Sequence, residues 1–434
     1  MSKLISSTLE QVCLHEKGAI ISGPFGSNIS SKFFVESGIP VIRGNNLSLN
    51  YDKFFDNHFV FVTPEKADEL NCYAYRNDLI FTAAGTIGQV GVIPENSRYT
   101  KYVISNKQIR ARIDTKKIDL LYAYYWFSSP WIRAFLIRNN KGSTVPLLTL
   151  SEIKDLPIVF PESIDEQKAI ISVIDNITKK IETNKKINDY LEEMAKTIYD
   201  YWFVQFDFPN ENGKPYKSSG GKMVNANGHI IPEGWTFCKV QDIISNICTG
   251  LNPRDNFKLG TGDIKYITVK NLTTNGTLDF TGCDTIDESA RTIVHNRSDI
   301  RIGDILFASI APLGRCYLIQ SEPTDWDINE SVFSIRANTD IITPAFLYLY
   351  FMSDAFIKHA TSSSTGSIFK GIRINTLLET ELCVPPLSVI LKFEERLASI
   401  FPLKSKNYEE IQRLSNLRDW LLPMLMNGQA TIED

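Results

Sequence analysis

The chain consists of two copies of one sequence plan, offset by about 225 of its 434 residues. Stretches typical of short strands ending at turns recur in the same order: Gly38 to Leu47 returns as Asp263 to Leu272, and Asn77 to Phe81 as Gly303 to Phe307. Ala84 to Gly88 then matches Ile310 to Gly314, and the aromatic run Leu121 to Phe127 matches Phe346 to Met352. A repeat of this length predicts two structural units built on one fold. Between the shared stretches the copies differ freely, as expected of one scaffold that carries two different binding surfaces; a duplication without functional meaning is the alternative.

A helix with coiled-coil spacing follows each copy. In the first copy the spacing of alternately three and four runs through Ile170, Ile174, Ile177, Ile181, Asn184, Asn188, Leu191, Ala195, Ile198 and Trp202. In the second it runs through Phe393, Leu397, Ile400, Lys404, Asn407, Ile411, Leu414, Arg418, Leu421 and Leu425, at a constant offset of 223 residues. Such spacing is typical of a helix that packs against a partner helix, so we expect the two helices to pack together.

Two details of these helices carry separate expectations. Asn184 and Asn407 occupy equivalent positions, where a buried polar residue fixes the register of a helix pair; exposed asparagines at a point where the helices part are the alternative. Pro402 removes a backbone donor and predicts a kink or a late start of the second helix.

These patterns divide the chain into five segments. They are a first module at 1–161, a spacer helix at 162–206, a linker at 207–232, a second module at 233–386 and a second spacer helix at 387–427. The linker is rich in Gly, Asn, Lys and Ser, so we expect it to be solvated. A helix is expected from Lys239 to Ile247, near the start of the second module.

Composition indicates a globular protein, with 43% apolar and 22% charged residues. The longest apolar stretches, such as Leu120 to Phe127, are shorter than the roughly 20 residues of a membrane span, and no signal pattern is present, so we expect a cytoplasmic protein. The seven cysteines form no C-x-x-C pair and the five histidines no H-E-x-x-H motif. Neither a disulfide framework nor a metal site is therefore expected.

Several motifs, in order, give the chain a family likeness. They are Pro24 to Ser27, Gly38 to Arg43, Gly85 to Gly88, Tyr199 to Phe208, Ile231 to Trp235 and Leu421 to Gly428. Together they resemble the specificity subunits of type I restriction-modification systems, over essentially the whole chain. The second copy departs from the first at Cys248 to Asn252 and at Ala311 to Gly314, which leaves the geometry of these loops open.

The resemblance implies an α/β (α+β) fold with two tandem mixed α/β target-recognition domains and two conserved helices packed as an antiparallel pair, related by a pseudo-twofold internal repeat. It implies double-stranded DNA, two methyltransferase subunits and, in the restriction complex, motor-nuclease subunits as partners. S-adenosylmethionine would be bound by the methyltransferase subunits, and no cofactor by this chain. The helices would act as a ruler and dock the methyltransferase subunits.

Motifs for methyl transfer and translocation are missing from the sequence. Asn252 to Asp255 lacks the second proline and the aromatic residue of an adenine-methyltransferase loop, and Gly221 to Met223 lacks the Ser or Thr of a phosphate-binding loop. Glu152 and Lys154 imitate the end of a nuclease motif, but an ordinary exposed pair explains them better. We expect a non-catalytic chain; an enzyme with a cryptic site is the alternative.

Base pairs are read by Arg, Lys, Asn, Gln, Ser and Thr side chains in the grooves of DNA. Candidate contacts in the polar loops are Arg43, Asn45, Asn46, Lys107 and Lys141 in the first module, and Lys270, Asn271, Arg315, Lys370 and Arg373 in the second. Solvated surface residues are the alternative for each. A helix of about 37 residues is about 55 Å long, well over one DNA turn of about 34 Å, which predicts two different half-sites with an unread spacer.

The net charge of −4 opposes DNA binding, since phosphate contacts favour a basic protein. Local positive charge, or phosphate contacts from a partner subunit, would reconcile the two. A scaffold whose modules bind protein is the alternative.

Overall fold

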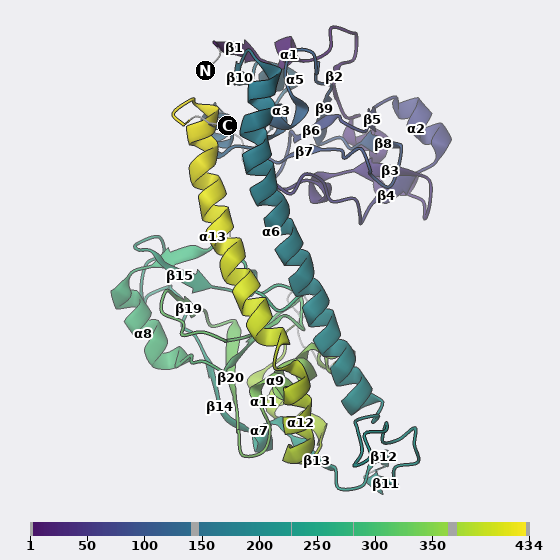
Figure 1. Ribbon diagram of the computed structural model, residues 1–434, viewed down its shortest axis with the longest axis vertical. Helices are drawn as coiled ribbons and strands as arrows, with labels where there is room; N and C mark the ends of the chain where they lie inside the picture. Colours follow the sequence, from purple (N-terminus) through teal and green to yellow (C-terminus); the bar gives the residue numbers. More distant parts are fainter. Residues whose placement is uncertain (1–2, 140–146, 227, 281, 363–370, 431–434) are drawn as a thin grey trace. The chain divides into compact units, whose positions relative to one another are not determined.

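The computed structural model describes residues 3–139, 147–226, 228–280, 282–362 and 371–430. The chain folds into two compact units: Met1–Thr183 with Ile411–Asp434, and Asn184–Glu410. Purple and blue elements of Figure 1 belong to the first module, green elements to the second. Each unit therefore contains one module and one end of both long helices.

Two four-stranded sheets form the body of the first module. One has the order β2-β9-β6-β7, with β2 (Ile20–Ser22), β9 (Gln108–Ala111), β6 (Leu79–Thr82) and β7 (Val90–Val92) antiparallel. The other has the order β4-β3-β8-β5, with β4 (Val60–Val62), β3 (Ile39–Ile42), β8 (Lys101–Ile104) and β5 (Tyr73–Tyr75), and its β3 and β8 are parallel. β1 (Leu4–Thr8) pairs with β10 (Pro157–Pro161), so the two ends of the module meet.

Short helices complete this module. They are α1 (Leu9–Val12), α2 (Pro64–Leu70), α3 (Leu120–Phe127), α4 (Pro130–Asn139) and α5 (Leu150–Lys154), with 3-10 turns at Gly26–Ile29, Ser31–Phe33 and Gly44–Asn46. The aromatic run of the sequence forms α3, and from Tyr122 to Phe127 every side chain is buried. This fully apolar helix lies in the module core, as its composition requires.

The second module repeats the plan. Its four-stranded sheet has the order β14-β20-β17-β18, with β14 (Ile244–Thr249), β20 (Val332–Ala337), β17 (Ile305–Ala308) and β18 (Cys316–Leu318). A second sheet has the order β16-β15-β19, with β16 (Asp284–Ile286), β15 (Ile264–Ile267) and β19 (Trp326–Ile328), and β13 (Thr236–Lys239) pairs with β21 (Glu381–Val384). Its helices are α7 (Val240–Ile243), α8 (Glu288–Ser298), α9 (Pro344–Met352), α10 (Asp354–Ser362) and α11 (Ile374–Leu378).

The helix expected from Lys239 to Ile247 is wrong over its second half. Only Val240–Ile243 is helical, and Ile244–Thr249 forms β14, which pairs with β20. Three isoleucines lie between 243 and 247. Their branched side chains favour a strand wherever a partner strand is available.

The long helices largely match their expected ranges. α6 spans Ile164–Tyr199, 36 residues, and continues into a π-helical segment at Asp200–Val204. The second helix is divided into α12 (Leu387–Leu397) and α13 (Ile400–Met426). The break precedes Pro402, which lies in the first turn of α13, where its missing N–H costs no helical bond. The late start expected at this proline is therefore confirmed.

Contacts inside each unit define an antiparallel helix pair. In the first unit Ile177 and Ile181 of α6 pack against Ile411 and Leu414 of α13. In the second unit the partner numbers fall as the α6 numbers rise: Asn184 bonds Glu410, Asn188 bonds Asn407 and Lys404, and Glu192 pairs with Lys404. α6 and α13 run side by side in Figure 1. The predicted contact residues Ile174, Leu191, Ile198, Leu397, Ile400 and Leu421 are buried or half-buried as well.

The two asparagines predicted at equivalent positions are both buried. Asn184 is 3% exposed and Asn407 is 8% exposed. Asn407 Nδ2 donates to Asn188 Oδ1 over 3.0 Å, and Asn184 Nδ2 donates to Glu410 Oε2 over 2.8 Å. Their burial favours the role in fixing register over the exposed alternative.

A buried tyrosine ties each module to α6. Tyr125 Oη in α3 donates to Asp175 over 3.0 Å, and Tyr348 Oη in α9 donates to Glu192 over 2.7 Å. The two tyrosines do not occupy equivalent positions of the aligned aromatic runs, in which Tyr125 corresponds to Tyr350. Burial alone raises the pKa of Asp175, but hydrogen bonds from Lys53 and Lys179 outweigh burial and the pKa is lowered.

The segment between the modules is mostly exposed, as expected of a solvated linker, but it is also folded. β11 (Met223–Ala226) and β12 (His229–Pro232) form a hairpin, and Asp207 accepts hydrogen bonds from the backbone and hydroxyl of Ser218. Phe208 stacks on Tyr216, with ring centres 4.6 Å apart, and packs against Trp235. Gly and Asn serve its turns, while a few aromatic residues anchor it to the module core.

Within the described ranges no helix is long and apolar enough to cross a bilayer. No group of three or more His, Cys, Asp or Glu side chains in the same ranges is placed to hold a metal ion. All seven cysteines are free thiols.

Candidate nucleic-acid interface

A polar cavity of about 740 Å³ opens in the first module. It lies where three loops meet: the turn after β3, the loop between β6 and β7, and the turn between β8 and β9. The turn after β3 contributes Arg43 and Asn45, and the turn between β8 and β9 contributes Lys107. Three residues that the sequence nominated separately therefore line one cavity. This arrangement presents donors and acceptors of the kinds that read base edges.

The turn after β3 holds Arg43 at the cavity wall. Arg43 N–H donates to Asn46 Oδ1 over 2.9 Å, and the Arg43 carbonyl accepts from Asn46 N–H over 2.9 Å. The Arg43 Nε is buried and has no hydrogen-bond partner among the described residues. A guanidinium with spare donors is suited to a carbonyl, phosphate or guanine acceptor.

Asn46 and Asn271 are structural residues, which corrects their nomination as DNA contacts. Asn46 is 0% exposed, and its Nδ2 donates to the carbonyls of Phe55 and Asn57, both over 2.9 Å. Asn271 is 6% exposed, accepts from the Thr268 N–H over 2.9 Å and donates to the Asp279 carbonyl over 2.8 Å. Side chains that are buried and bonded in this way close a loop and cannot reach a base.

In each module, a glycine allows two backbone segments to lie in close contact. An ideal Cβ on Gly23 would lie 1.8 Å from the Ser105 carbonyl oxygen, and one on Gly250 would lie 1.7 Å from the Ile328 carbonyl oxygen. Only glycine fits at either position. Gly250 is therefore the counterpart of Gly23, and the departure noted at Cys248 to Asn252 is a shift of one residue rather than a different loop.

The second module places other side chains at equivalent positions. Lys270 is exposed and precedes Asn271, as Asn45 precedes Asn46 in the first module. The Arg315 carbonyl accepts from Ala308 N–H as the Gln89 carbonyl accepts from Thr82 N–H, so Arg315 matches Gln89. Arg373 is exposed at the start of α11. Two further candidates, Lys141 and Lys370, lie outside the described residues.

Polar residues that the sequence did not nominate also line the first cavity. They are Thr82, Thr86, Gln89, Ser105, Asn106 and Gln108. Gln108 is 1% exposed, and its Nε2 has no hydrogen-bond partner in the described part of the chain. The sequence signal for these residues is the polar run from Ser105 to Gln108, where β8 ends and β9 begins. Lys107 is the one residue of this run that is predicted as a DNA contact from the sequence.

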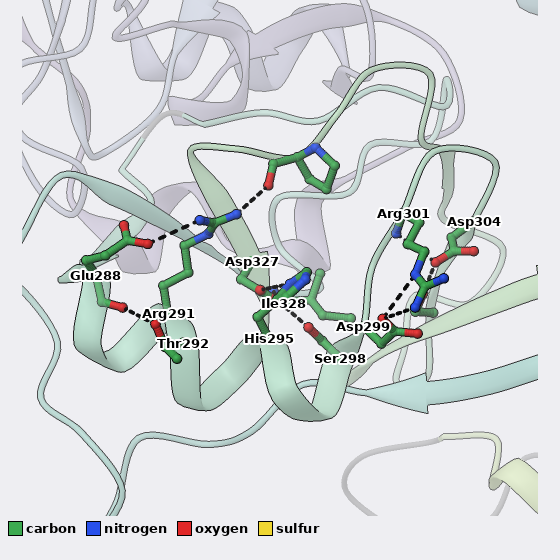
Figure 2. A network of polar contacts seen from close by, with 12 residues as sticks. Glu288, Arg291, Thr292, His295, Ser298, Asp299, Arg301, Asp304, Asp327 and Ile328 are labelled. Carbon is green, nitrogen blue, oxygen red and sulfur yellow. Dashed lines mark hydrogen bonds and ion pairs between the residues drawn. The ribbon is translucent and has the colours of Figure 1, made fainter.

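A polar network fixes α8 in the second module (Figure 2). Ser298 Oγ donates to Asp327 Oδ1 over 2.6 Å, and His295 Nδ1 lies 3.0 Å from Asp327 Oδ2. Asp327 is 0% exposed, and burial raises its pKa against the opposing hydrogen bonds from Ser298, the Ile328 N–H and His295. Ser298 is bonded to the carboxylate and 1% exposed, so this trio is not arranged for nucleophilic catalysis.

The hydrogen bonds of Asp327 to α8 distinguish the second module from the first, whereas the neighbouring ion pair is present in both modules. Strand register places Val103 where the second module has Asp327. By contrast, Arg336 bonds the buried Asp304 over 2.7 Å, and Arg112 Nε donates to the buried Asp78 over 3.3 Å in the first module. The two modules thus share this ion pair. Asp327, which holds α8 in the second module, is replaced by Val103 in the first.

Known proteins share this architecture over the full length of the chain. A solved type I restriction-modification S subunit from M. genitalium has a TM-score of 0.52 at 14% identity, covering 98% of this chain and 96% of that one. The specificity subunit of the type I restriction enzyme MjaIX from Methanocaldococcus jannaschii is 22% identical over 364 residues, 83% of this chain and 79% of the relative. The HindI specificity subunit of Haemophilus influenzae is 23% identical over 350 residues, 68% and 73% of the two chains.

A family model places the likeness on both copies of the repeat. The model, described as the type I restriction modification DNA specificity domain, matches residues 7–193 and 232–413. Each match takes in one module together with most of the helix that follows it. Members of this family are non-catalytic specificity subunits. Because the two matches cover most of its length, the chain belongs to the type I restriction-modification DNA specificity family.

Proposed function

We propose that the chain reads a bipartite, asymmetric sequence in double-stranded DNA, with one half-site for each module. The observation that carries the proposal is the different chemistry at equivalent positions of the repeat. Asn45 in the first module corresponds to Lys270 in the second. Arg315 of the second stands where the first has Gln89, whose amide is bonded to Thr82 and to the Leu47 carbonyl. Asn and Gln pair with adenine edges, whereas Arg and Lys pair with guanine. Two modules with different side chains at these positions would read different half-sites.

The helices would set the spacing between the half-sites. A helix of 36 residues such as α6 is about 54 Å long at about 1.5 Å per residue. One turn of DNA is about 34 Å, so half-sites set by this length would lie more than one turn apart. The base pairs between them would go unread.

The partners proposed are two methyltransferase subunits and, in the restriction complex, motor-nuclease subunits. S-adenosylmethionine would be held by the methyltransferase subunits, and this chain would bind no cofactor. The α6–α13 pair would dock the methyltransferase subunits, which methylate adenine at the site that this chain selects. A partner that supplies phosphate contacts would account for DNA binding despite the net charge of −4.

The test is to co-express the chain with its methyltransferase and to map methylated adenines across the host genome. We expect one two-part motif with a fixed spacer. Arg43→Ala should relax discrimination in the first half-site only, and Lys270→Ala in the second only, each by about 1–3 kcal/mol. Arg98→Ala is the control, because Arg98 is exposed in the first module outside the cavity.

The alternative function is that of a scaffold whose modules bind protein rather than DNA. The acidic net charge favours this alternative. The purified complex would then show no preference for any sequence in a random DNA library. Methyl transfer by the isolated chain would instead support a cryptic enzyme.

A further inference from the structure

Phe25 is the most exposed large apolar side chain in the described part of the protein, at 85% exposure. The other exposed large apolar residues of the first unit are between 38% and 61% exposed. An aromatic ring held this far into water has no packing role in the module. Packing inside the module therefore does not explain the position of Phe25. The residues around it suggest a different role.

Phe25 is not among the residues that line the cavity, but the backbone on either side of it lies against residues that do. On one side, Gly23 N–H donates to the Gln108 carbonyl over 2.8 Å, and Gly23 lies against the Ser105 carbonyl. On the other side, a Cβ on Gly26 would lie 3.0 Å from Asn106 Nδ2. Ser105, Asn106 and Gln108 all line the cavity. Phe25 is thus bracketed by two glycines that touch the cavity wall.

The turn that follows is firmly held. The Phe25 carbonyl accepts from Asn28 N–H over 2.9 Å, and the 3-10 turn Gly26–Ile29 ends in Ile29, which is buried and also lines the cavity. Pro24 restricts the preceding backbone. The ring is therefore carried by a rigid loop, as a side chain that must enter a partner surface requires.

We propose that Phe25 is an apolar wedge that inserts at a base step of the first half-site, next to the bases read from the cavity. This inference rests on the proposed DNA-reading function. Phenylalanine is among the residues that proteins insert between base pairs, where the ring replaces part of the lost stacking. The second module has Asn252 at the equivalent distance from Gly250, so the wedge acts in the first half-site alone.

The test uses the complex of this chain with its methyltransferase subunits and the DNA target defined by methylation mapping. 2-Aminopurine is placed singly at positions in and beside each half-site, because its fluorescence rises when its neighbours unstack. The adenine that is methylated is left unsubstituted, since a methyltransferase unstacks its own target base. We expect brightening at one step of the first half-site and at no step of the second.

Phe25→Ala should abolish this brightening and weaken specific binding about 10- to 100-fold, while Phe25→Leu should retain part of both effects. Phe135→Ala is the matched control, since Phe135 is 41% exposed in the same unit but lies in α4, none of whose described residues lines the cavity. It should change affinity less than about twofold, within the ordinary effect of a surface substitution. Unfolding curves of the variants check that each one folds.

The outcomes separate the two proposals. If the wild-type complex shows no preference for the mapped target, the proposed function fails and the wedge falls with it. If the complex binds its target but no probe brightens, or Phe25→Ala binds as tightly as wild type, only the wedge is overturned. Loss of methyltransferase assembly in Phe25→Ala, with unchanged DNA affinity in the complex that remains, would assign Phe25 to a protein contact and also overturn it.

Discussion

Neighbouring asparagines of the first module have opposite environments. Asn45 is exposed, and its one side-chain hydrogen bond to a described residue, donated to the His58 carbonyl, is 3.4 Å long. Asn46 is fully buried and makes three bonds to backbone groups at 2.9 Å. Residue type alone suggests the same role for both side chains. Burial assigns Asn46 to holding the loop, whereas Asn45 is exposed and remains a proposed DNA contact.

Asn46→Ala should therefore destabilise the chain by about 1–3 kcal/mol, because several buried backbone groups would lose their partner. Asn45→Ala should cost less than about 0.5 kcal/mol. Urea unfolding followed by circular dichroism measures both. Equal effects of the two substitutions would show that Asn46 does not hold the loop.

Asp175 gives the first unit a pH-dependent contact. Its folded-state pKa lies below the ordinary value of 3.8, because hydrogen bonds from Lys53 and Lys179 outweigh burial. The stabilisation is thus present above the ordinary value and is lost as pH falls through the lower folded-state pKa.

Asp175→Asn should be less stable than wild type by about 1.5–3 kcal/mol at neutral pH, and the difference should shrink as the pH falls below 3.8. Urea unfolding at a series of pH values measures this. Glu36→Gln, at an exposed position, is the control and should show no such trend. A difference that stays constant down to pH 3 would contradict the assignment.

At the scale of the element, the helix pair is apolar in one unit and polar in the other. Ile181 and Ile411 meet in the first unit. Their equivalents at the offset of 223 residues are Lys404 and Asn188, which are bonded to each other in the second unit. A repeat that keeps the spacing but changes the chemistry permits one register only, because a shifted pairing would leave Lys404 buried without a carboxylate.

Lys404→Met should destabilise the second unit by about 3–5 kcal/mol, because Glu192 would be left buried without its cation. The double variant Glu192→Leu with Lys404→Met should recover most of this loss. Lys406→Met, exposed on the same helix, is the control. A double variant no more stable than Lys404→Met, in urea unfolding, would contradict this account of the pair.

Across the whole molecule, the first unit is built from two separate stretches of the sequence, whereas the second, Asn184–Glu410, is one continuous stretch. The first unit takes Ile411–Asp434 from the far end of the chain. There Leu422, Leu425 and Met426 of α13 join Ile170 and Ile174 of α6 in the core of the first module. Both helices thus pass from one unit to the other, between Thr183 and Asn184 and between Glu410 and Ile411.

These two junctions define the test of the ruler. Seven residues inserted at both, with helical apolar and polar spacing continued, keep the heptad phase of the pair and lengthen it by about 10 Å. The unread spacer of the methylated motif should then grow by about three base pairs, at about 3.4 Å each. Methylation mapping measures the spacer. An active complex with an unchanged spacer would show that the helices do not set it.

Features that depend on the spacing of residues could be predicted from the sequence alone. The offset of the two copies, the packing of Ile177 and Ile181 against Ile411 and Leu414, and the late start of the second helix all follow from patterns that the sequence itself contains. A helical period or a proline acts on its own neighbours, so these features could be predicted without a fold.

Which of the predicted DNA contacts share a surface depends on the tertiary structure and could not be predicted from the sequence. Arg43 and Lys107 meet in one cavity because β3 and β8 are parallel neighbours, although the strands are far apart in the sequence. Asn46 and Asn271 are excluded as DNA contacts because the surrounding loops bury them. The segment that contains Phe208 is folded because the Phe208 ring packs against Tyr216 and Trp235. Burial is a property of what the rest of the chain brings to a residue, and a local pattern does not contain it.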